Sequence, residues 1–216
     1  MGTFITLSNK KSRIPKEFQA DDNRFPESLV KYLLERYSKK GDKVIDIFAG
    51  LGTTLIVAEK MGRMGYGIEM SLKRVKYIQS KIKAKNNIIF GSALFPDKNL
   101  PQMDLCITSP PYMSKSCKEN PLGVPQETYE GYLDKLVAIF TKLKPFMKKN
   151  AYIFIEASNL KGKETTTLAW DIAKKISQIY SFEGEVVVGW QGKGTCKGAG
   201  TYGYGYDHSY CLVFRN

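Results

Sequence analysis

The chain has 216 residues, 43% of them hydrophobic and 25% charged, which is ordinary for one soluble globular domain whose core needs no disulfide or metal. Its 33 Lys and Arg residues against 21 Asp and Glu give a net charge of +12. This excess favours a polyanionic partner, nucleic acid before an anionic membrane surface, although part of it can be simple solvated surface. No run approaches the ~18 apolar residues of a membrane span, and Met1 to Lys16 lacks an apolar signal-peptide core. We therefore expect a cytoplasmic protein that does not enter a membrane.

Strand and helix patterns alternate along the chain. Residues 1–23 are polar and mixed and predict a loosely held N-terminal arm. The expected elements that follow are a helix from Pro26 to Tyr37, a buried strand at 43–48, a helix to Met61, a strand ending at Glu69, a basic helix at 72–85, strands at 87–90 and 103–108, a helix at 127–148, a strand at 152–156, a helix at 167–180, and final strands at 183–190 and 209–214.

This alternation predicts an α/β fold with a mostly parallel sheet covered by helices on both faces. The last two strands, joined by a connection rich in glycine and tyrosine, predict one antiparallel strand near the C-terminus. Ligands of such sheets bind outside the carboxyl ends of the strands, near the point where the strand order reverses. We expect the functional site there.

The segment Asp46-Ile47-Phe48-Ala49-Gly50-Leu51-Gly52-Thr53-Thr54 joins the strand at 43–48 to its helix. Two glycines at alternate positions let the backbone approach a ligand closely, and the helix N-terminus offers amide donors. Leu55 stands where the third glycine of a dinucleotide fingerprint would be. The segment alone is a weak indication of a bound nucleotide.

Glu69 ends the following strand, where a carboxylate can accept hydrogen bonds from both ribose hydroxyls. Together with the glycine segment it predicts a nucleoside-containing cofactor, either a dinucleotide or S-adenosylmethionine. The alternative is a tight strand-to-helix turn followed by an exposed glutamate.

The turn Thr108-Ser109-Pro110-Pro111-Tyr112 follows the strand at 103–108. Two consecutive prolines cannot donate backbone hydrogen bonds and fix their own φ angles, so the turn is rigid and unsuited to continue a strand. It can hold a hydroxyl, a carbonyl and an aromatic ring around one small, flat substrate.

At this turn the chain resembles the amino-methyltransferases of the DNA methylase N-4/N-6 family, which transfer a methyl group from S-adenosylmethionine to an exocyclic amine. Asp46 to Thr54 resembles their cofactor loop, Glu69 their ribose carboxylate, and Arg24 to Leu29 the segment that covers the methionine part of the cofactor. Thr108 to Tyr112 resembles their catalytic motif in the serine form, which the family associates with N4 of cytosine. The resemblance implies a Rossmann-like class I methyltransferase with a seven-stranded sheet and S-adenosylmethionine as cofactor.

The resemblance extends over nearly the whole chain, since 167–173 and 207–214 are similar to the family's later sheet segments. Ser92 stands where many relatives carry an aspartate for the adenine amine, and Phe48 is as well suited to the core as to the cofactor site. The implied catalytic residues are Ser109, Pro110, Pro111 and Tyr112, and the implied cofactor-binding residues are Phe25, Pro26, Asp46, Phe48, Ala49, Gly50, Gly52, Thr53, Thr54, Glu69, Met70, Ser92 and Thr108.

The chemistry of the turn is consistent with amine methylation. An exocyclic amine on a pyrimidine is a poor nucleophile, because its lone pair is delocalised into the ring. If the Ser109 hydroxyl and the Pro110 carbonyl each accept one N–H, the lone pair turns toward the methyl group for direct transfer. Tyr112 offers a face on which an extruded base can stack. Neither a metal nor a covalent enzyme intermediate is needed, and Cys106, Cys117, Cys196 and Cys211 form no zinc-binding pattern with each other or with His208.

Two further segments are candidates for contact with nucleic acid. The connection Gly192 to Tyr206 combines glycines with tyrosines and lysines, a composition that suits unpaired bases but is also common in ordinary β connections. The loop after the catalytic turn adds lysines that can meet phosphates or serve only solubility. The candidate residues are Lys115, Lys118, Lys193, Lys197, Tyr202, Tyr204 and Tyr206.

Residues 24–216 are expected to form a single catalytic domain without a separate target-recognition domain, acting as a monomer or homodimer. The nucleic acid can be DNA or a structured RNA such as rRNA, and no residue decides between them. The alternatives are methylation of another planar amine (adenine, guanine or a protein glutamine) and a catalytically silent module that binds cofactor or nucleic acid.

Overall fold

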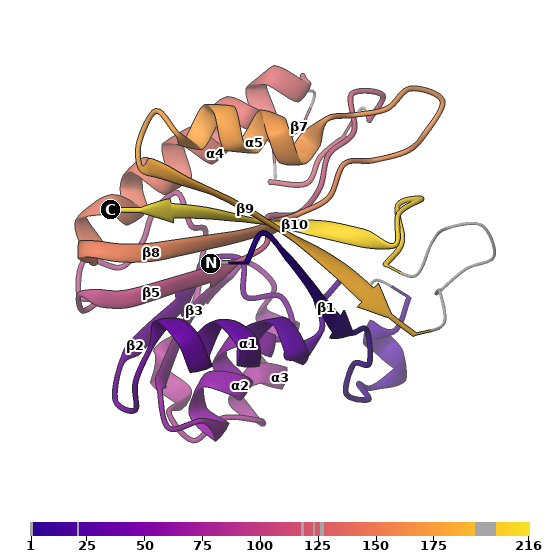
Figure 1. The fold of residues 1–216 in the computed structure, drawn as a ribbon. Coiled ribbons are helices and arrows are strands. Elements are labelled where there is room, and N and C mark those ends of the chain that lie inside the picture. Colours follow the sequence, from indigo (N-terminus) through magenta and orange to yellow (C-terminus); the bar gives the residue numbers. More distant parts are fainter. Residues whose placement is uncertain (1, 21, 118, 123, 126–127, 193–201) are drawn as a thin grey trace.

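An eight-stranded sheet runs through the centre of the molecule (Figure 1) in the order β1-β9-β10-β8-β5-β2-β3-β4. The computed structural model describes residues 2–20, 22–117, 119–122, 124–125, 128–192 and 202–216. The strands of the sheet are β1 (Phe4–Ser8), β2 (Lys43–Asp46), β3 (Met64–Glu69), β4 (Ile88–Phe90), β5 (Met103–Thr108), β8 (Met147–Ala157), β9 (Ser181–Gln191) and β10 (His208–Arg215). A separate ribbon consists of β6 (Glu119–Asn120) and β7 (Val124–Pro125).

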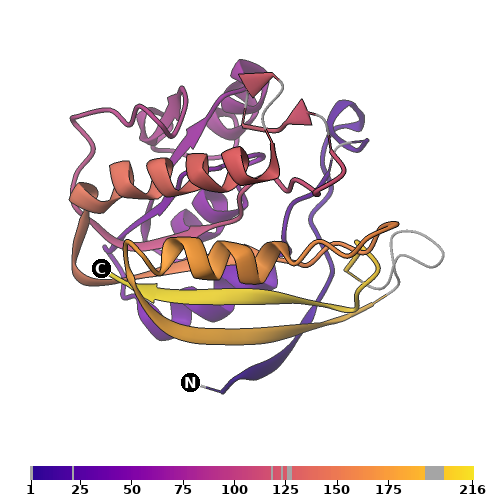
Figure 2. The same cartoon turned by 90° about the horizontal axis from the view of Figure 1, so that it is seen from above.

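Helices cover both faces of this sheet. The α-helices are α1 (Glu27–Tyr37), α2 (Thr53–Lys60), α3 (Leu72–Gln79), α4 (Tyr129–Leu143) and α5 (Leu168–Ile176), and the short 3-10 helices are η1 (Lys16–Phe18), η2 (Lys85–Asn87) and η3 (Lys144–Phe146). Figure 1 shows α4 and α5 on one face and α1, α2 and α3 on the other, and Figure 2 shows α5 lying over β10. Each face of the sheet carries its own buried apolar cluster. Because the central strands are buried on both faces, their sequences are nearly continuous apolar runs.

The strand directions confirm the predicted fold class. β10 is antiparallel to both β8 and β9, whereas the other neighbours in the sheet pair in parallel. The chain is therefore an α/β protein with one antiparallel strand near its C-terminus. No helix among the described residues is both long enough and apolar enough to cross a membrane.

The N-terminal segment differs from its prediction. Residues 4–8 form β1, which pairs in parallel with β9 and adds an eighth strand to the seven implied by the family resemblance. The reason is their alternation: Ile5 and Leu7 pack partly buried against the core cluster beneath α1, while Phe4, Thr6 and Ser8 face solvent. Further along, the Ser12 amide donates to the Glu27 carboxylate at the start of α1. The arm is thus held at two places.

The region around α4 also differs from its prediction. The helix ends at Leu143 instead of continuing to Lys148, because Pro145 follows within the 3-10 helix η3. β8 then begins at Met147, five residues before the predicted start, and includes Asn150 at a φ of 64°. A register shift against β5 in this stretch accommodates the irregular residue.

The order of the strands fixes where a ligand can bind. From β2 the chain moves outward through β3 and β4, and it then returns to β5 on the other side of β2. A crevice forms outside the carboxyl ends of β2 and β5 because the connections leave in opposite directions. Both motifs predicted from the sequence begin at these two strand ends.

Candidate functional site

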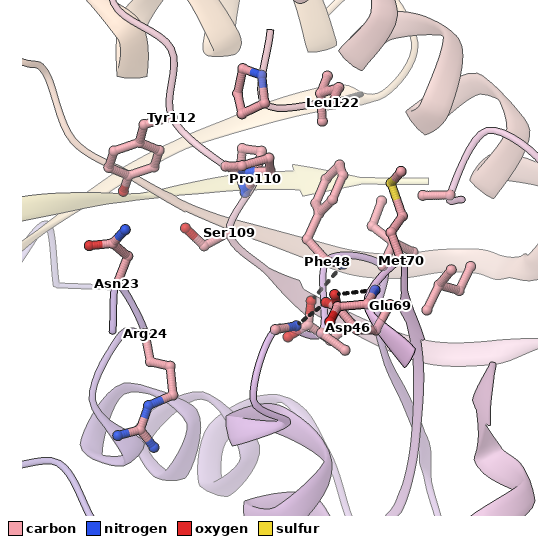
Figure 3. Close-up of a pocket in the computed structure, with 18 of the residues that line it drawn as sticks. Asn23, Arg24, Asp46, Phe48, Glu69, Met70, Ser109, Pro110, Tyr112 and Leu122 are labelled. Carbon is pink, nitrogen blue, oxygen red and sulfur yellow. Dashed lines mark hydrogen bonds between the residues drawn. The ribbon is translucent and has the colours of Figure 1, made fainter. Parts of the chain in front are cut away.

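A cavity of about 840 Å³ opens at the carboxyl ends of β2, β3 and β5. Its wall includes Phe48, Glu69, Ser109 and Tyr112, and Figure 3 shows Tyr112 and Ser109 to one side while Phe48, Glu69 and Asp46 lie together on the other. The cavity therefore has room for two neighbouring ligands, one beside the glycine segment and one beside the proline turn.

Asp46 organises the floor between the two ends. Its buried carboxylate accepts hydrogen bonds from the Phe48 amide at 3.0 Å, the Thr54 hydroxyl at 3.0 Å and the Thr108 hydroxyl at 2.6 Å. The first two bonds shape the glycine segment, and the third joins β2 to β5. Desolvation by burial raises the pKa of Asp46 to about 6, and the three hydrogen bonds oppose that shift.

The raised pKa of Asp46 predicts a measurable pH dependence of stability. Between its ordinary value of 3.8 and about 6, the folded protein binds a proton more tightly than the unfolded chain, so the free energy of unfolding falls as the pH rises through this window. The loss is at most about 3 kcal/mol for a shift of this size. Asp46→Asn should lose this component, since an amide can accept from Phe48 and Thr108 and donate to Thr54. Urea unfolding of both proteins across the window measures the difference, and identical pH profiles would contradict the assignment.

Glu69 ties the ends of two loops together. One oxygen of this buried carboxylate accepts from the Gly50 amide and the other from the Ser71 amide, both at 2.8 Å. Each oxygen keeps a second lone pair for a ligand in the cavity that it lines. A carboxylate fixed in this way is suited to the vicinal hydroxyls of a ribose.

The two glycines of the segment serve different purposes. Gly50 has a φ of 55° and a Cβ there would meet only open space and its own loop, so the backbone faces the cavity. Gly52 has a φ of 79° and is packed beneath α3, where a Cβ would lie 2.8 Å from Ile78. Only the first glycine permits a close approach by a ligand, and the second permits a close approach by a helix.

Thr53 carries an unusual side chain for a buried position. Thr53 lines the cavity at the start of α2, and its buried hydroxyl is one of two buried polar groups among the described side chains that have no hydrogen-bond partner. An unpaired buried hydroxyl is costly unless a ligand completes it. We interpret Thr53 as a contact for a polar ligand group.

The predicted cofactor residues divide into two layers. Nine of the thirteen line the cavity: Phe25, Asp46, Phe48, Ala49, Gly50, Thr53, Glu69, Met70 and Ser92. The other four, Pro26, Gly52, Thr54 and Thr108, do not line it. Thr54 and Thr108 are buried behind Asp46 and donate to it, and Pro26 stands before α1 as its N-cap, so these three residues support the ones that line the cavity.

Ser109, Pro110, Pro111 and Tyr112 all line the opposite end of the cavity. The Tyr132 hydroxyl of α4 donates to the Pro111 carbonyl at 2.8 Å, which fixes the turn against the helix. The wall also includes Asn23, which lies across from Ser109 and Tyr112 in Figure 3. Asn23 was not among the residues predicted from the sequence, whereas its neighbour Arg24, which is held by Asp22, begins the segment predicted to cover the methionine part of the cofactor.

Glu156 lies directly behind this end of the cavity. One of its oxygens accepts from the Ser109 hydroxyl and from the Tyr112 hydroxyl, both at 3.0 Å, and the other accepts from Tyr202. Ser209 is a further hydrogen-bonding partner of this carboxylate. Complete burial raises the pKa of Glu156 despite these donors. Sequence analysis missed this residue, although an acidic side chain within the apolar run 151–157 was an available signal.

Of the described residues predicted to contact nucleic acid, one lines the cavity and the others do not. Tyr204 lines it, with its ring 5.1 Å from that of Tyr112. Tyr202 does not, because its ring stacks on Trp190 and its hydroxyl faces Glu156. Tyr206 lies outside under Lys161, and exposed Lys115 extends over Tyr129. Lys118, Lys193 and Lys197 are outside the described residues, as is Cys196; Cys106 and Cys211 are buried as expected.

Comparison with known sequences concerns the first part of the chain. Residues 3–80 match a family model described as DNA methylase. Type II methyltransferase M2.DpnII of Streptococcus pneumoniae is 32% identical over 77 residues, which cover 34% of this chain and 29% of that protein. Type II methyltransferase M.HinfI of Haemophilus influenzae is 35% identical over 81 residues, which cover 37% of this chain and 23% of that protein. The matched part thus spans about a quarter of each relative, and the family model ends before Ser109.

Comparison with solved structures concerns nearly the whole chain. TrmN from Thermus thermophilus gives a TM-score of 0.58 at 13% identity, covering 92% of this chain and 51% of that one. A TehB-like SAM-dependent methyltransferase from Corynebacterium glutamicum gives 0.58 at 12% identity and 92% coverage of both chains. Identities this low bear on the fold alone. The chain has the Rossmann-like fold of S-adenosylmethionine-dependent methyltransferases, and its residues 3–80 are similar to the DNA methylase family model.

Proposed function

We propose that the protein transfers a methyl group from S-adenosylmethionine to the exocyclic amine of a base in nucleic acid, with N4 of cytosine in DNA as the first target. The observation that carries this proposal is the hydrogen bond that the Ser109 hydroxyl donates to Glu156. Because the hydroxyl donates its only proton to Glu156, its oxygen can act toward a ligand only as an acceptor of an N–H at the cavity wall.

S-adenosylmethionine fits the residues beside the glycine segment. The Glu69 carboxylate is placed to accept the ribose hydroxyls, and the unpaired Thr53 hydroxyl at the start of α2 offers a partner to a polar group of the cofactor. Phe48 and Met70 give the adenine an apolar wall. When bound, the cofactor supplies an electrophilic methyl group on a sulfonium.

The residues around Ser109 can prepare the amine. One N–H of the target amine would be accepted by the Ser109 oxygen and the other by the Pro110 carbonyl, which draws the nitrogen lone pair out of the ring plane. The nitrogen then forms a bond to the methyl carbon as the carbon–sulfur bond breaks, and the sulfonium becomes a neutral thioether. The methylated nitrogen carries the positive charge until it releases one proton, which Glu156 can receive through Ser109.

Tyr112 and Tyr204 can hold the base itself. Their rings are 5.1 Å apart with an interplanar angle of 51°, so they converge at the cavity wall without stacking on each other. An extruded base loses a few kcal/mol of pairing and stacking, which contact with aromatic rings partly restores.

The choice of polymer and base rests on weaker support. The family description, DNA methylase, favours DNA over structured RNA, and the net charge of +12 suits either polymer. The serine in the catalytic turn favours cytosine over adenine through the family resemblance alone. The oligomeric state, monomer or homodimer, stays a prediction.

One experiment tests the whole proposal. The protein is incubated with S-adenosylmethionine labelled in the methyl group and with matched pools of DNA and RNA, which are then digested and analysed by nucleoside mass spectrometry. We expect labelled N4-methyl-2′-deoxycytidine from DNA. Label on adenine or guanine would replace the proposed target by the amine of another base. Calorimetric cofactor binding without label in any product would identify a silent module.

A further inference from the structure

Four aromatic side chains form a continuous row on one side of the sheet beside the cavity. Trp170 comes from α5, and Tyr210, His208 and Tyr206 follow each other at alternate positions leading into β10. Ring centroids are 6.2 Å apart from Trp170 to Tyr210, 5.3 Å from Tyr210 to His208, and 5.2 Å from His208 to Tyr206. We call these four residues the aromatic row.

One end of the aromatic row meets the cavity. Tyr206 closes the turn that carries Tyr204 to the cavity wall, since the Tyr206 amide donates to the Gly203 carbonyl. Lys161, whose amide donates to the Tyr204 carbonyl, places its ammonium 4.3 Å from the centre of the Tyr206 ring. The row is therefore continuous with the end of the cavity proposed for the target base.

The row is also open to solvent. The Trp170 side chain is 56% exposed, and the other three rings are each partly exposed. Single exposed aromatics are ordinary, but a connected line of them beside a cavity marks a surface that binds something. The exposed charged residues next to Tyr206 are Lys161 and Lys163 with the acids Glu164 and Asp207, and exposed Glu185 stands near Tyr210 at the far end. The ammonium over the Tyr206 ring belongs to Lys161, so a cation stands where the row joins the cavity.

We propose that the aromatic row is a stacking platform for unpaired nucleotides that flank the target base, so that the substrate is a single-stranded or locally opened segment of nucleic acid. The proposal rests on the proposed function, because it takes the cavity end at Ser109 as the place of the target base. Bases of any sequence can stack on aromatic rings, while the Lys161 ammonium at the cavity end can attract the phosphate between the target and its neighbour.

A fully paired duplex would use this surface poorly. Its bases are already stacked on each other, and their faces are not available to side chains on a sheet. A strand that enters the cavity with one base can instead lay the following bases on the row. The row thus favours an opened strand over a closed helix without any need for contacts to base edges.

Binding of fluorescent oligonucleotides measured by anisotropy tests the proposal. The set contains single strands with the target base alone, the same strands extended by several nucleotides on either side, and the extended strand in a closed duplex. We expect the wild-type protein to bind the extended single strand at least tenfold more tightly than the short one, and more tightly than the duplex. Trp170→Ala and Tyr206→Ala should each weaken binding of the extended strand by about tenfold.

Matched variants separate stacking from general damage. Phe4→Ala removes a side chain that is 63% exposed on β1, at the outer edge of the sheet, and should bind every oligonucleotide as the wild type does. Trp170→Phe keeps a ring and should retain most of the affinity. Equal binding of the extended strand by the wild type, Trp170→Ala and Tyr206→Ala would overturn the proposal, as would an equal loss in Phe4→Ala.

The binding readout is independent of methyl transfer. If no base is methylated but the row variants still lose affinity for the extended strand, the proposed function fails and the platform stands. If bases are methylated and extension of the strand has no effect on affinity, the platform fails and the proposed function stands. DNA and RNA versions of each oligonucleotide show which polymer the platform prefers.

Discussion

Ser109→Ala is expected to lower kcat for methyl transfer by two to three orders of magnitude. The substitution removes the oxygen that would accept an amine N–H while the lone pair forms its new bond, and loss of one such contact in a transition state costs about this much. Cofactor affinity should be unchanged, because Ser109 lies apart from Glu69 in the cavity. Single-turnover transfer from labelled S-adenosylmethionine gives the rate, and calorimetry gives the affinity.

A second serine provides the control for this variant. Ser116 is exposed in the loop that follows the catalytic turn and exchanges a hydrogen bond with Ser114. Ser116→Ala should transfer methyl groups at the wild-type rate. A Ser109→Ala protein that keeps its kcat would show that the serine has no role in the mechanism. A Ser109→Ala protein that loses cofactor affinity would show that the substitution disturbs the fold of the cavity.

The cofactor end of the site could be predicted because its residues are close together in the sequence. One turn after β2 supplies Phe48, Gly50 and Thr53, and the end of β3 supplies Glu69. Parallel strands side by side bring their carboxyl ends together, so the alternation of strands and helices was enough to place these residues. Seven of the nine predicted cofactor residues that line the cavity come from these two strand ends, and the other two are Phe25 and Ser92.

A sequence pattern does not separate a ligand contact from the residue that supports it. Thr53 and Thr54 are adjacent and chemically identical, yet Thr53 lines the cavity and its hydroxyl has no partner, whereas Thr54 does not line the cavity and donates to Asp46. The difference follows from the direction of each side chain at the start of α2. The positions of two residues in the sequence do not show which side chain points into the cavity, because that depends on how α2 packs against the sheet.

The partners of Ser109 lie far from it along the chain. Glu156 lies near the end of β8, which pairs with β5, and Tyr202 and Ser209 reach the same carboxylate from the connection before β10 and from β10 itself. Only the insertion of β10 between β8 and β9 brings these groups together. β1 was missed for a related reason, since a short alternating strand at an edge is recognised by the partner it pairs with and not by its own composition.

Glu156→Gln should change the chemistry of Ser109 without removing it. A carboxylate can only accept, so the hydroxyls of Ser109, Tyr112 and Tyr202 all donate to Glu156. A glutamine amide offers one accepting oxygen and one donating nitrogen. If the glutamine oxygen accepts from Tyr202, the glutamine nitrogen donates to the Ser109 oxygen. The Ser109 proton then points toward the target amine, although the mechanism needs the Ser109 oxygen to accept an N–H from that amine. We expect a loss of kcat of about a hundredfold with little change in cofactor affinity.

The pH profile distinguishes this positioning role of Glu156 from a structural one. Burial raises the pKa of the carboxyl above its ordinary value, and the ionised form is the one that orients Ser109 and can take up the released proton. The wild-type kcat should therefore fall as the pH is lowered through this raised pKa, and the profile of Glu156→Gln should lack that fall. Glu185→Gln, an exposed change on β9, should keep both the rate and the profile of the wild type. A Glu156→Gln protein with a slow rate and an unchanged acid limb would mean that another group titrates and that Glu156 only supports the fold.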